Sequence, residues 1–182
     1  KVLGAYKLNE KPYAIMPSFT IGTVMGKTSL IGDKESWTID ELISFADQQP
    51  EGTKIFEYAT KDSILSTLLM YNMEEYIDYE TGKCNFDSPT FIKILEFANR
   101  FDEEFVWDEN APSTPSLISE NKLTLVNTNF SDVLSFQAYK KMFGEEVTYI
   151  GYPTTSGSGS VLESNGSALA INAKAKDKEG AW

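Results

Sequence analysis

The sequence predicts an α/β protein in which helices pack on a layered sheet. Short runs rich in branched apolar residues alternate with stretches in which apolar residues recur at helical spacing. This alternation extends through most of the 182 residues, without an internal repeat or an apolar run long enough to span a membrane. Hydrophobic residues make up 41% of the chain, so such an arrangement can enclose a sizeable core.

Composition excludes several classes of function. The formal net charge of -11 argues against nucleic acid and anionic membrane surfaces as partners, because both are bound through basic patches. The sequence contains no histidine and a single cysteine, Cys84. These counts remove Ser-His-Asp and Cys-His catalysis, the common zinc sites and any internal disulfide. We therefore expect neither a cofactor nor a metal.

The N-terminal stretch, residues 1–27, is predicted to be extended. Pro12, Pro17 and Gly22 interrupt its apolar residues. This pattern favours several strands joined by bends over a helix, because proline and glycine both weaken regular structure.

A helix start at Thr38 is the clearest local signal in the sequence. Thr38 and Glu41 have the spacing of a capping box, and Trp37 and Leu42 occupy the positions of a hydrophobic staple. The helix is expected to end before Pro50, because the residue before a proline disfavours helical backbone.

Two more helices are predicted in the middle of the chain. A short strand at residues 54–58 leads into the first, and Ser88 with Pro89 forms the cap and first turn of the second. Their apolar residues recur at helical spacing and are assigned to the core: Ile64, Leu65, Leu68, Leu69, Phe91, Ile94, Leu95, Ala98 and Phe101. The acidic residues at 102–109 match no calcium-loop spacing, so we interpret them as a solvated helix end rather than a cation site or a catalytic carboxylate pair.

A strand that runs directly into a helix attracts the most functional interest. The strand, at residues 123–126, is expected to stop in a polar turn at 127–129. Ser131 or Asn129 would then cap a helix with the apolar residues Val133, Leu134, Phe136 and Tyr139.

Phe130 lies at this strand–helix junction, where backbone amides point outward and rigid elements hold the loop on both sides. An aromatic face flanked by asparagine side chains suits a sugar ring, whose C–H groups stack on the aromatic ring and whose hydroxyls bond the amides. The alternative is that Phe130 is the first core residue of the helix.

The C-terminal part of the sequence contains weaker signals. The helix is expected to end at Gly144, and a strand is expected at residues 147–151. The serine- and glycine-rich residues 153–160 lack the ending of a phosphate-binding loop and are interpreted as a flexible connector or hinge rim. A turn at 164–167, a short strand at 168–173 and the first turn of a helix complete the sequence.

Several short motifs resemble one family when they are taken in order. They are Pro17 in an extended segment, the Trp37-Thr38-Ile39-Asp40-Glu41-Leu42 helix start, Thr81-Gly82-Lys83 with Phe86-Asp87-Ser88-Pro89, Asn121-Lys122-Leu123-Thr124-Leu125, and Ser167-Ala168-Leu169-Ala170-Ile171 followed by Lys178-Glu179-Gly180-Ala181-Trp182. The series covers nearly the whole sequence. It resembles the family 1 extracellular solute-binding proteins, which are the sugar-capturing components of ABC importers.

The resemblance implies a periplasmic-binding-protein-like fold of type II, with two α/β lobes joined by a hinge and a ligand in the cleft between them. Residues 1–25 would form a crossover or hinge strand, and residues 26–148 the second lobe. Residues 149–182 would form the return crossover and part of the first lobe. It further implies that this sequence is an internal segment, mostly the second lobe, without the remainder of the first lobe and the C-terminal helices.

The resemblance also implies a set of ligand-binding residues on loops that face the cleft: Ser18, Phe19, Tyr58, Asp62, Asn129, Phe130 and Asn165. Tyr58 and Phe130 would be stacking platforms, while the asparagines and Asp62 would bond sugar hydroxyls. Each has a simpler interpretation. Phe19 would be a core residue, Asp62 a helix cap and Asn165 the positive-φ residue of its turn.

The function implied by the resemblance is capture of a carbohydrate, without chemistry, for the membrane permease of an ABC importer. The protein would then be extracellular, either lipid-anchored at the cell surface or periplasmic. Two alternatives remain open, a glycoside hydrolase that uses two carboxylates and a non-catalytic surface adhesion domain. Because the terminal segments would lack sheet partners, we also expect copies of this chain to associate with one another.

Overall fold

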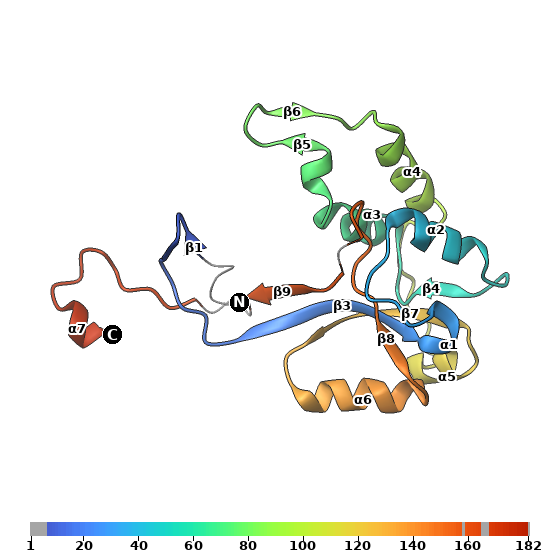
Figure 1. Cartoon of the computed structure of the whole chain (residues 1–182). Helices are drawn as coiled ribbons and strands as arrows, with labels where there is room; N and C mark the ends of the chain where they lie inside the picture. The colour runs from blue at the N-terminus through green and yellow to red at the C-terminus, as the bar shows by residue number, and fades with distance from the viewer. Residues whose placement is uncertain (1–6, 158, 165–167, 182) are drawn as a thin grey trace.

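A mixed five-stranded sheet organises the chain, as Figure 1 shows for this computed structural model, which describes residues 7–157, 159–164 and 168–181. Its strands are β3 (Phe19–Lys27), β4 (Lys54–Phe56), β7 (Leu123–Phe130), β8 (Val147–Tyr149) and β9 (Val161–Ser164). The sheet runs β4-β7-β3-β8, and β9 also pairs with β3. Strand β4 is parallel to β7, whereas β3 is antiparallel to its three partners. The predicted α/β class is therefore confirmed.

Strands β8 and β9 occupy the same edge of β3. Strand β8 pairs with Met25 to Lys27, and β9 pairs with Phe19 to Gly22. Between them, residues 150–160 leave the sheet and return to it. The two strands thus act as one edge strand that is interrupted by an excursion.

Helices cover both faces of the sheet (Figure 1). One face carries α2 (Ile39–Asp47), α3 (Lys61–Met70) and α4 (Pro89–Ala98), and the other carries α5 (Thr114–Ser119) and α6 (Val133–Phe143). The shorter elements are β1 (Lys7–Leu8), β2 (Lys11–Pro12), α1 (Thr28–Ile31), η2 (Met73–Glu75), β5 (Ile77–Asp78), β6 (Lys83–Cys84) and α7 (Lys178–Ala181).

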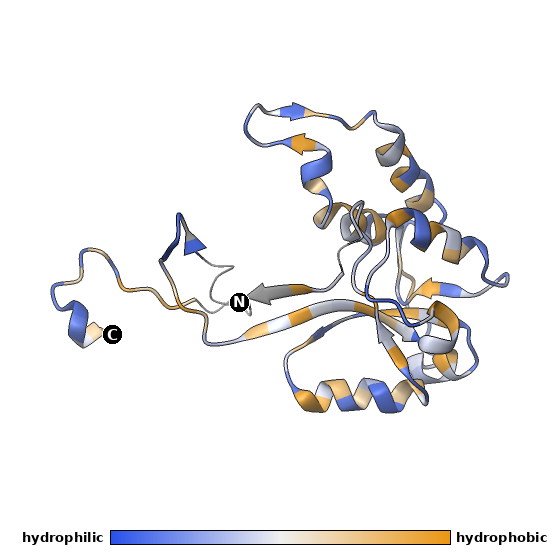
Figure 2. Ribbon diagram, viewed as in Figure 1, coloured by the Kyte–Doolittle hydropathy of each residue, from blue (hydrophilic) through white to orange (hydrophobic). Residues whose placement is uncertain are grey.

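Two hydrophobic clusters fill these layers, one on each face of the sheet. Val24 belongs to the cluster beneath α2, α3 and α4, and its neighbour Met25 belongs to the cluster beneath α6. This split follows from the pleat, which turns successive side chains to opposite faces. Hydrophobic residues recur along β3 and β4, whereas most of α7, which lies apart from the sheet, is hydrophilic (Figure 2).

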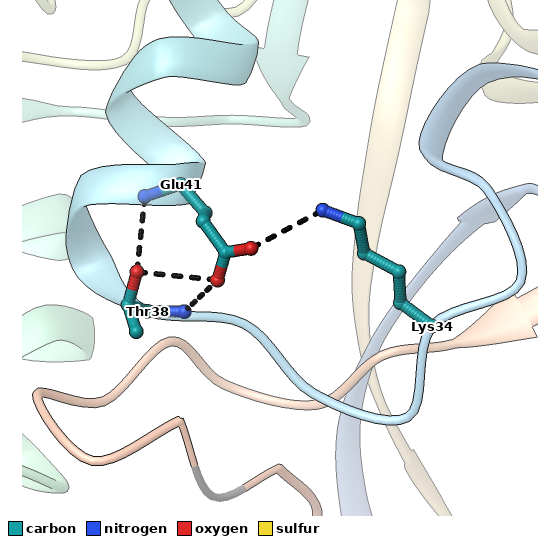
Figure 3. Close-up of polar contacts among 3 residues, drawn as sticks. All are labelled: Lys34, Thr38 and Glu41. Carbon is teal, nitrogen blue, oxygen red and sulfur yellow. Dashed lines mark hydrogen bonds and ion pairs between the residues drawn. The ribbon is translucent and has the colours of Figure 1, made fainter.

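The capping box at α2 is confirmed (Figure 3). The backbone N–H of Glu41 donates to Thr38 Oγ1 at 3.2 Å, and the backbone N–H of Thr38 donates to Glu41 Oε2 at 2.8 Å. Lys34 Nζ lies 3.3 Å from Glu41 Oε1. Hydrogen bonds from the Thr38 backbone and from Lys34 hold the pKa of the Glu41 carboxyl below its usual value. Glu41 is therefore ionised at neutral pH.

Three other predicted helix ends are also confirmed. Ser88 caps α4 with Pro89 in its first turn, and Gly144 ends α6 at a φ of 71°. Helix α2 ends at Asp47, ahead of Pro50. Each signal lies within a few residues of the turn that it specifies, so it does not depend on the rest of the fold.

The predicted turn at residues 127–129 is wrong. Strand β7 continues through it to Phe130, because β3 offers backbone partners along this length: Gly22 faces Asn129 and Val24 faces Asn127. The cap of α6 is Asp132, rather than Ser131 or Asn129. Hydrogen bonds from the backbone and hydroxyl of Ser135 lower the pKa of the Asp132 carboxyl.

The remaining corrections concern strand limits and burial. Gly22 does not interrupt β3, which is extended over nine residues. Of the strand expected at 168–173, Leu169 forms a single bridge with Ile15. Val133 and Leu134, two of the apolar residues of α6, are 69% and 76% exposed and do not pack inward.

Residues 153–157 and 159–160 are also more firmly held than the expected flexible connector. Asn72, only 3% exposed, donates to the Pro153 carbonyl at 3.1 Å and accepts from the Thr155 backbone at 2.8 Å. Gly151, at a φ of 80°, lies so close to Gly159 that an added Cβ would meet the Gly159 carbonyl carbon at 2.2 Å. These contacts fix the excursion on the α2–α3 side of the sheet.

We expect the Thr38→Ala substitution to lower the free energy of unfolding by about 1 kcal/mol, because the first turn of α2 loses its cap. Urea denaturation at pH 7 measures the change. Ser44→Ala, at an exposed position in the middle of the same helix, is the matched control and should not destabilise. An unchanged stability in Thr38→Ala would contradict the role of the cap.

The same box should make stability depend on pH. Because the folded-state pKa of Glu41 is lowered from 4.5, its contribution is present above about pH 4.5 and is lost as the pH falls through the folded-state value. The stability difference between wild type and Glu41→Gln should therefore shrink on acidification. A difference that stays constant from pH 7 to pH 3 would contradict this assignment.

Candidate functional site

The candidate site begins at the C-terminal end of β4, where the chain turns into α3. Tyr58 has a φ of 53° and its side chain is 55% exposed. A bulky residue with positive φ is an outlier, and such backbone strain clusters at functional sites. The turn directs an aromatic ring outward instead of into the core, which is the first indication of a binding role.

Tyr58 is the first ring of an exposed series that we call the aromatic platform: Tyr58, Phe105 and Trp107. The rings of Tyr58 and Phe105 meet edge to face, with centroids 4.8 Å apart. Trp107 continues the series with its centroid 6.3 Å from that of Phe105. Phe105 is 48% and Trp107 74% exposed, so the platform presents aromatic surface to solvent.

Backbone contacts hold the platform segment against the start of α3. The N–H of Lys61 donates to the Asp102 carbonyl at 2.8 Å, and Thr60 and Asp102 form a parallel bridge. Lys61 Nζ also lies 3.5 Å from Glu103 Oε1. The segment at Asp102 therefore pairs with the chain just after β4, and this pairing places Phe105 beside Tyr58.

Hollows lie on both sides of Tyr58. The larger, about 650 Å³, lies between β4 and the ends of α2 and α4, and its lining includes Tyr58, Phe101, Phe105, Arg100, Asp102 and Glu104. The smaller, about 110 Å³, lies between the end of β4, α3 and β7, and its lining includes Glu57, Tyr58, Ser63, Thr67 and Asn127. Glu57 accepts a hydrogen bond from the Thr114 hydroxyl.

Chemically, this arrangement suits a neutral polyhydroxylated ring. Aromatic faces stack on C–H groups, while carboxylate and amide side chains at the rim accept and donate hydrogen bonds to hydroxyls. Among the residues that the structure describes, there is no group of three or more cysteine, aspartate or glutamate side chains arranged to hold a metal ion. The same described residues include no helix long and apolar enough to cross a membrane.

The predicted site residues Tyr58 and Asp62 are both located here. Asp62 lies in the first turn of α3 and is exposed, and the cap of that helix is Thr60. The alternative interpretation of Asp62 as a cap residue is therefore wrong. Asn129 is exposed on β7, two residues beyond Asn127 and hence on the same face of the strand.

Phe130 is not brought together with Tyr58. Its ring packs edge to face against Phe136, Tyr139 and Tyr149, with centroids 5.7 to 5.8 Å away, on the face that carries α6. Asn127, which borders a hollow with Tyr58, points to the opposite face because it lies three positions before Phe130 on the same strand. The two rings do not form one groove, and ligand contact by Phe130 remains a prediction.

The other predicted residues lie at the N-terminal end of β3 or outside the described residues. Ser18 is half-buried just before β3, and Phe19 is 41% exposed at its first position, so Phe19 is not a core residue. Asn165 lies outside the described residues. Ligand contact by Ser18, Phe19 and Asn165 is untested.

The sequence reasoning missed Phe105, Trp107 and Asn127. The first two were visible as an apolar and aromatic triplet, residues 105–107, within a strongly acidic stretch that was interpreted only through its charges. A tryptophan between acidic residues has no core to enter, which was the available signal. Asn127 was assigned to a turn and was therefore not considered as a residue projecting from a strand.

Comparison with known proteins bears on the fold. No protein-family model matches the sequence, and no curated protein matches it. Among solved structures, the sugar-binding protein MalE from Xanthomonas citri superposes with a TM-score of 0.61 at 13% identity, covering 100% of this chain and 49% of the other.

Two further solved structures give similar agreement. A solute-binding protein of an ABC transporter from Thermotoga lettingae, bound with alpha-D-tagatose, has a TM-score of 0.53 at 16% identity, with 100% and 50% of the chains covered. Maltose-bound T. maritima MalE3 has a TM-score of 0.53 at 18% identity, with 98% and 50% covered. The chain spans about half the length of these proteins, and it shares the fold of ABC-transporter solute-binding proteins.

We expect Tyr58→Gly to be more stable than Tyr58→Ala by about 1 kcal/mol, because glycine adopts a φ of 53° without the steric cost that alanine meets there. Both variants lose the same contact with Phe105, so each is the control for the other. Urea denaturation measures the difference. Equal stabilities would mean that the backbone at Tyr58 is not strained.

Proposed function

We propose that this chain belongs to the substrate-binding component of an ABC importer and captures a carbohydrate in an interlobe cleft without chemistry. The observation that carries the proposal is the exposed aromatic platform at the end of β4. Several solved proteins with this fold are named as sugar-binding or carry a sugar. Carbohydrate capture requires exposed aromatic faces on which sugar rings stack, and the platform offers them.

The spacing of the platform supports a ligand of more than one sugar ring. Tyr58, Phe105 and Trp107 lie in series with neighbouring rings inclined at 82° and 72°, so the platform offers separate aromatic faces to different rings of an oligosaccharide. Asp62 and Asn129 would bond hydroxyls at the rim. Ligand contact by Phe130, Ser18, Phe19 and Asn165 remains a further part of the proposal.

The proposal includes a division of the chain into lobes. Residues 1–25 would form the crossover strand, 26–148 the second lobe, and 149–182 the return crossover with part of the first lobe. Ligand capture would close the two lobes about the crossovers. The partner would be the membrane permease of the importer, and the protein would be extracellular, lipid-anchored or periplasmic.

The main alternative is a glycoside hydrolase with two carboxylates, since Glu57 and Glu104 line the hollows beside Tyr58. A surface adhesion domain with no small ligand is the second alternative. Saturable binding without turnover distinguishes capture from hydrolysis, and the absence of any response to sugars would favour adhesion.

We expect the full-length protein to be stabilised saturably by maltose or maltotriose in a thermal-shift panel, with no product released. Tyr58→Ala and Trp107→Ala should each weaken binding by about 1–3 kcal/mol, because each removes a stacking surface, and we predict the same for Phe130→Ala. Tyr79→Ala, at a remote tyrosine that is 68% exposed, is the control and should bind normally.

The outcomes separate the hypotheses. Release of glucose or of a shortened oligosaccharide would select the hydrolase. No stabilisation by any sugar of the panel would contradict carbohydrate capture. Normal binding by both Tyr58→Ala and Trp107→Ala would remove the platform from the site while leaving the function intact.

We also propose that the 182-residue chain self-associates by exchange of its terminal segments. Thr20 pairs with β9 and Ile15 bridges to Leu169, so the described parts of the two terminal segments pair with each other and can pair equally well between copies. Light scattering of the isolated chain should give the mass of a dimer. A monomeric mass across micromolar concentrations would contradict the exchange.

A further inference from the structure

The excursion of residues 150–160 places Tyr152 beside the smaller hollow. Trp37 Nε1 donates to the Gly151 carbonyl at 2.9 Å, and Gly151 donates to the Val24 carbonyl at 3.0 Å. Tyr152 is only 5% exposed, and its ring stacks on Tyr71, at the end of α3, with centroids 4.3 Å apart. These contacts fix the position of the Tyr152 ring.

The Tyr152 hydroxyl donates to Asn127 Oδ1 at 2.7 Å, which is a short and well-formed hydrogen bond. Asn127 projects from the middle of β7, where backbone pairing with Val24 of β3 fixes the strand. In this hydrogen bond the tyrosine hydroxyl is the donor and the amide oxygen of Asn127 is the acceptor. Tyr152 therefore holds Asn127 with its Nδ2 group directed away from the tyrosine.

Asn127 borders the smaller hollow. Asn127 lines it together with Tyr58, Glu57 and Thr67, and its side chain is exposed. Within the part of the chain that the structure describes, Asn127 Nδ2 has no hydrogen-bond partner. Its two N–H donors are thus available beside the first ring of the aromatic platform.

We propose that Asn127 is a ligand-binding residue of the carbohydrate site and that Tyr152 is its positioning residue. Asn127 Nδ2 would donate to a hydroxyl or ring oxygen of the sugar that stacks on Tyr58. Because Tyr152 belongs to the excursion between β8 and β9, the orientation of the binding amide depends on a segment outside the site. The inference rests on the proposed function, since it names a binding residue of that same site and its role as a hydrogen-bond donor.

Asn127→Asp tests the binding role, with maltose and maltotriose as probes in calorimetry on the full-length protein. The carboxylate still accepts from Tyr152, so the fold is kept, but both donors are lost. We expect affinity to fall about tenfold while the unfolding midpoint stays within a few degrees of wild type. Asn85→Asp, an exposed asparagine beyond β6, controls for the added charge and should bind normally.

Tyr152→Phe tests the positioning role. It keeps the ring on Tyr71 and removes only the hydroxyl, so we expect an affinity loss of about threefold.

A third measurement follows the Asn127 side chain directly in NMR spectra of the wild type. The two N–H signals of its side-chain amide, assigned by their absence from Asn127→Asp, should shift on adding maltose. The Asn85 pair should not shift.

The outcomes are distinct. If wild type binds a sugar of the panel and Asn127→Asp binds it equally well, the inference is overturned and the proposed function stands. If wild type binds none of them, the proposed function fails and the inference fails with it. Equal binding by Tyr152→Phe, with an affinity loss in Asn127→Asp, would overturn only the positioning role.

Discussion

Backbone pairing along both edges of β3 is the interaction on which the other elements depend. On one edge, β7 pairs with β3 from Ile21 to Gly26, and through β7 the short strand β4 is held in the sheet. On the other edge, β8 and β9 divide the length of β3 between them. Because β3 is extended without a break, the strands that carry the candidate site have a fixed register. The pleat then assigns Asn127 and Asn129 to one face and Phe130 to the other.

The features that could be predicted from sequence are those whose cause lies within a few residues. The capping box of Thr38 and Glu41, the cap at Ser88 and the end of α6 at Gly144 all follow from local hydrogen bonding and backbone sterics. The α/β class followed because alternating patterns reflect which faces are buried. The prediction of a turn at residues 127–129 was wrong because the cause of the structure there is not local. Its polar residues form a strand because a distant segment, β3, supplies their partners.

Only part of the candidate site could be predicted from the sequence. Tyr58 was predicted, but its positive φ depends on how β4 meets α3. Phe105 and Trp107 were hidden because their segment was interpreted through its acidic residues. Their relation to Tyr58 arises from the bridge between Thr60 and Asp102, which no sequence period indicates. Tyr58 and Phe130 were both predicted as stacking platforms, but they do not share a groove, because β7 continues to Phe130 and turns it towards α6, where three aromatic rings pack against it.

The close approach of Gly151 and Gly159 has a mechanical consequence. Each glycine is tolerated only because it has no side chain: a Cβ on Gly151 would overlap the Gly159 backbone, and a Cβ on Gly159 would lie 2.9 Å from the Ile150 carbonyl. The segment that leaves the sheet after β8 and the segment that returns to it before β9 are therefore in direct main-chain contact at these two glycines, with no side chain between them. Movement of the segment at Gly151 must therefore displace the segment at Gly159, so the two would move as one rigid unit rather than independently.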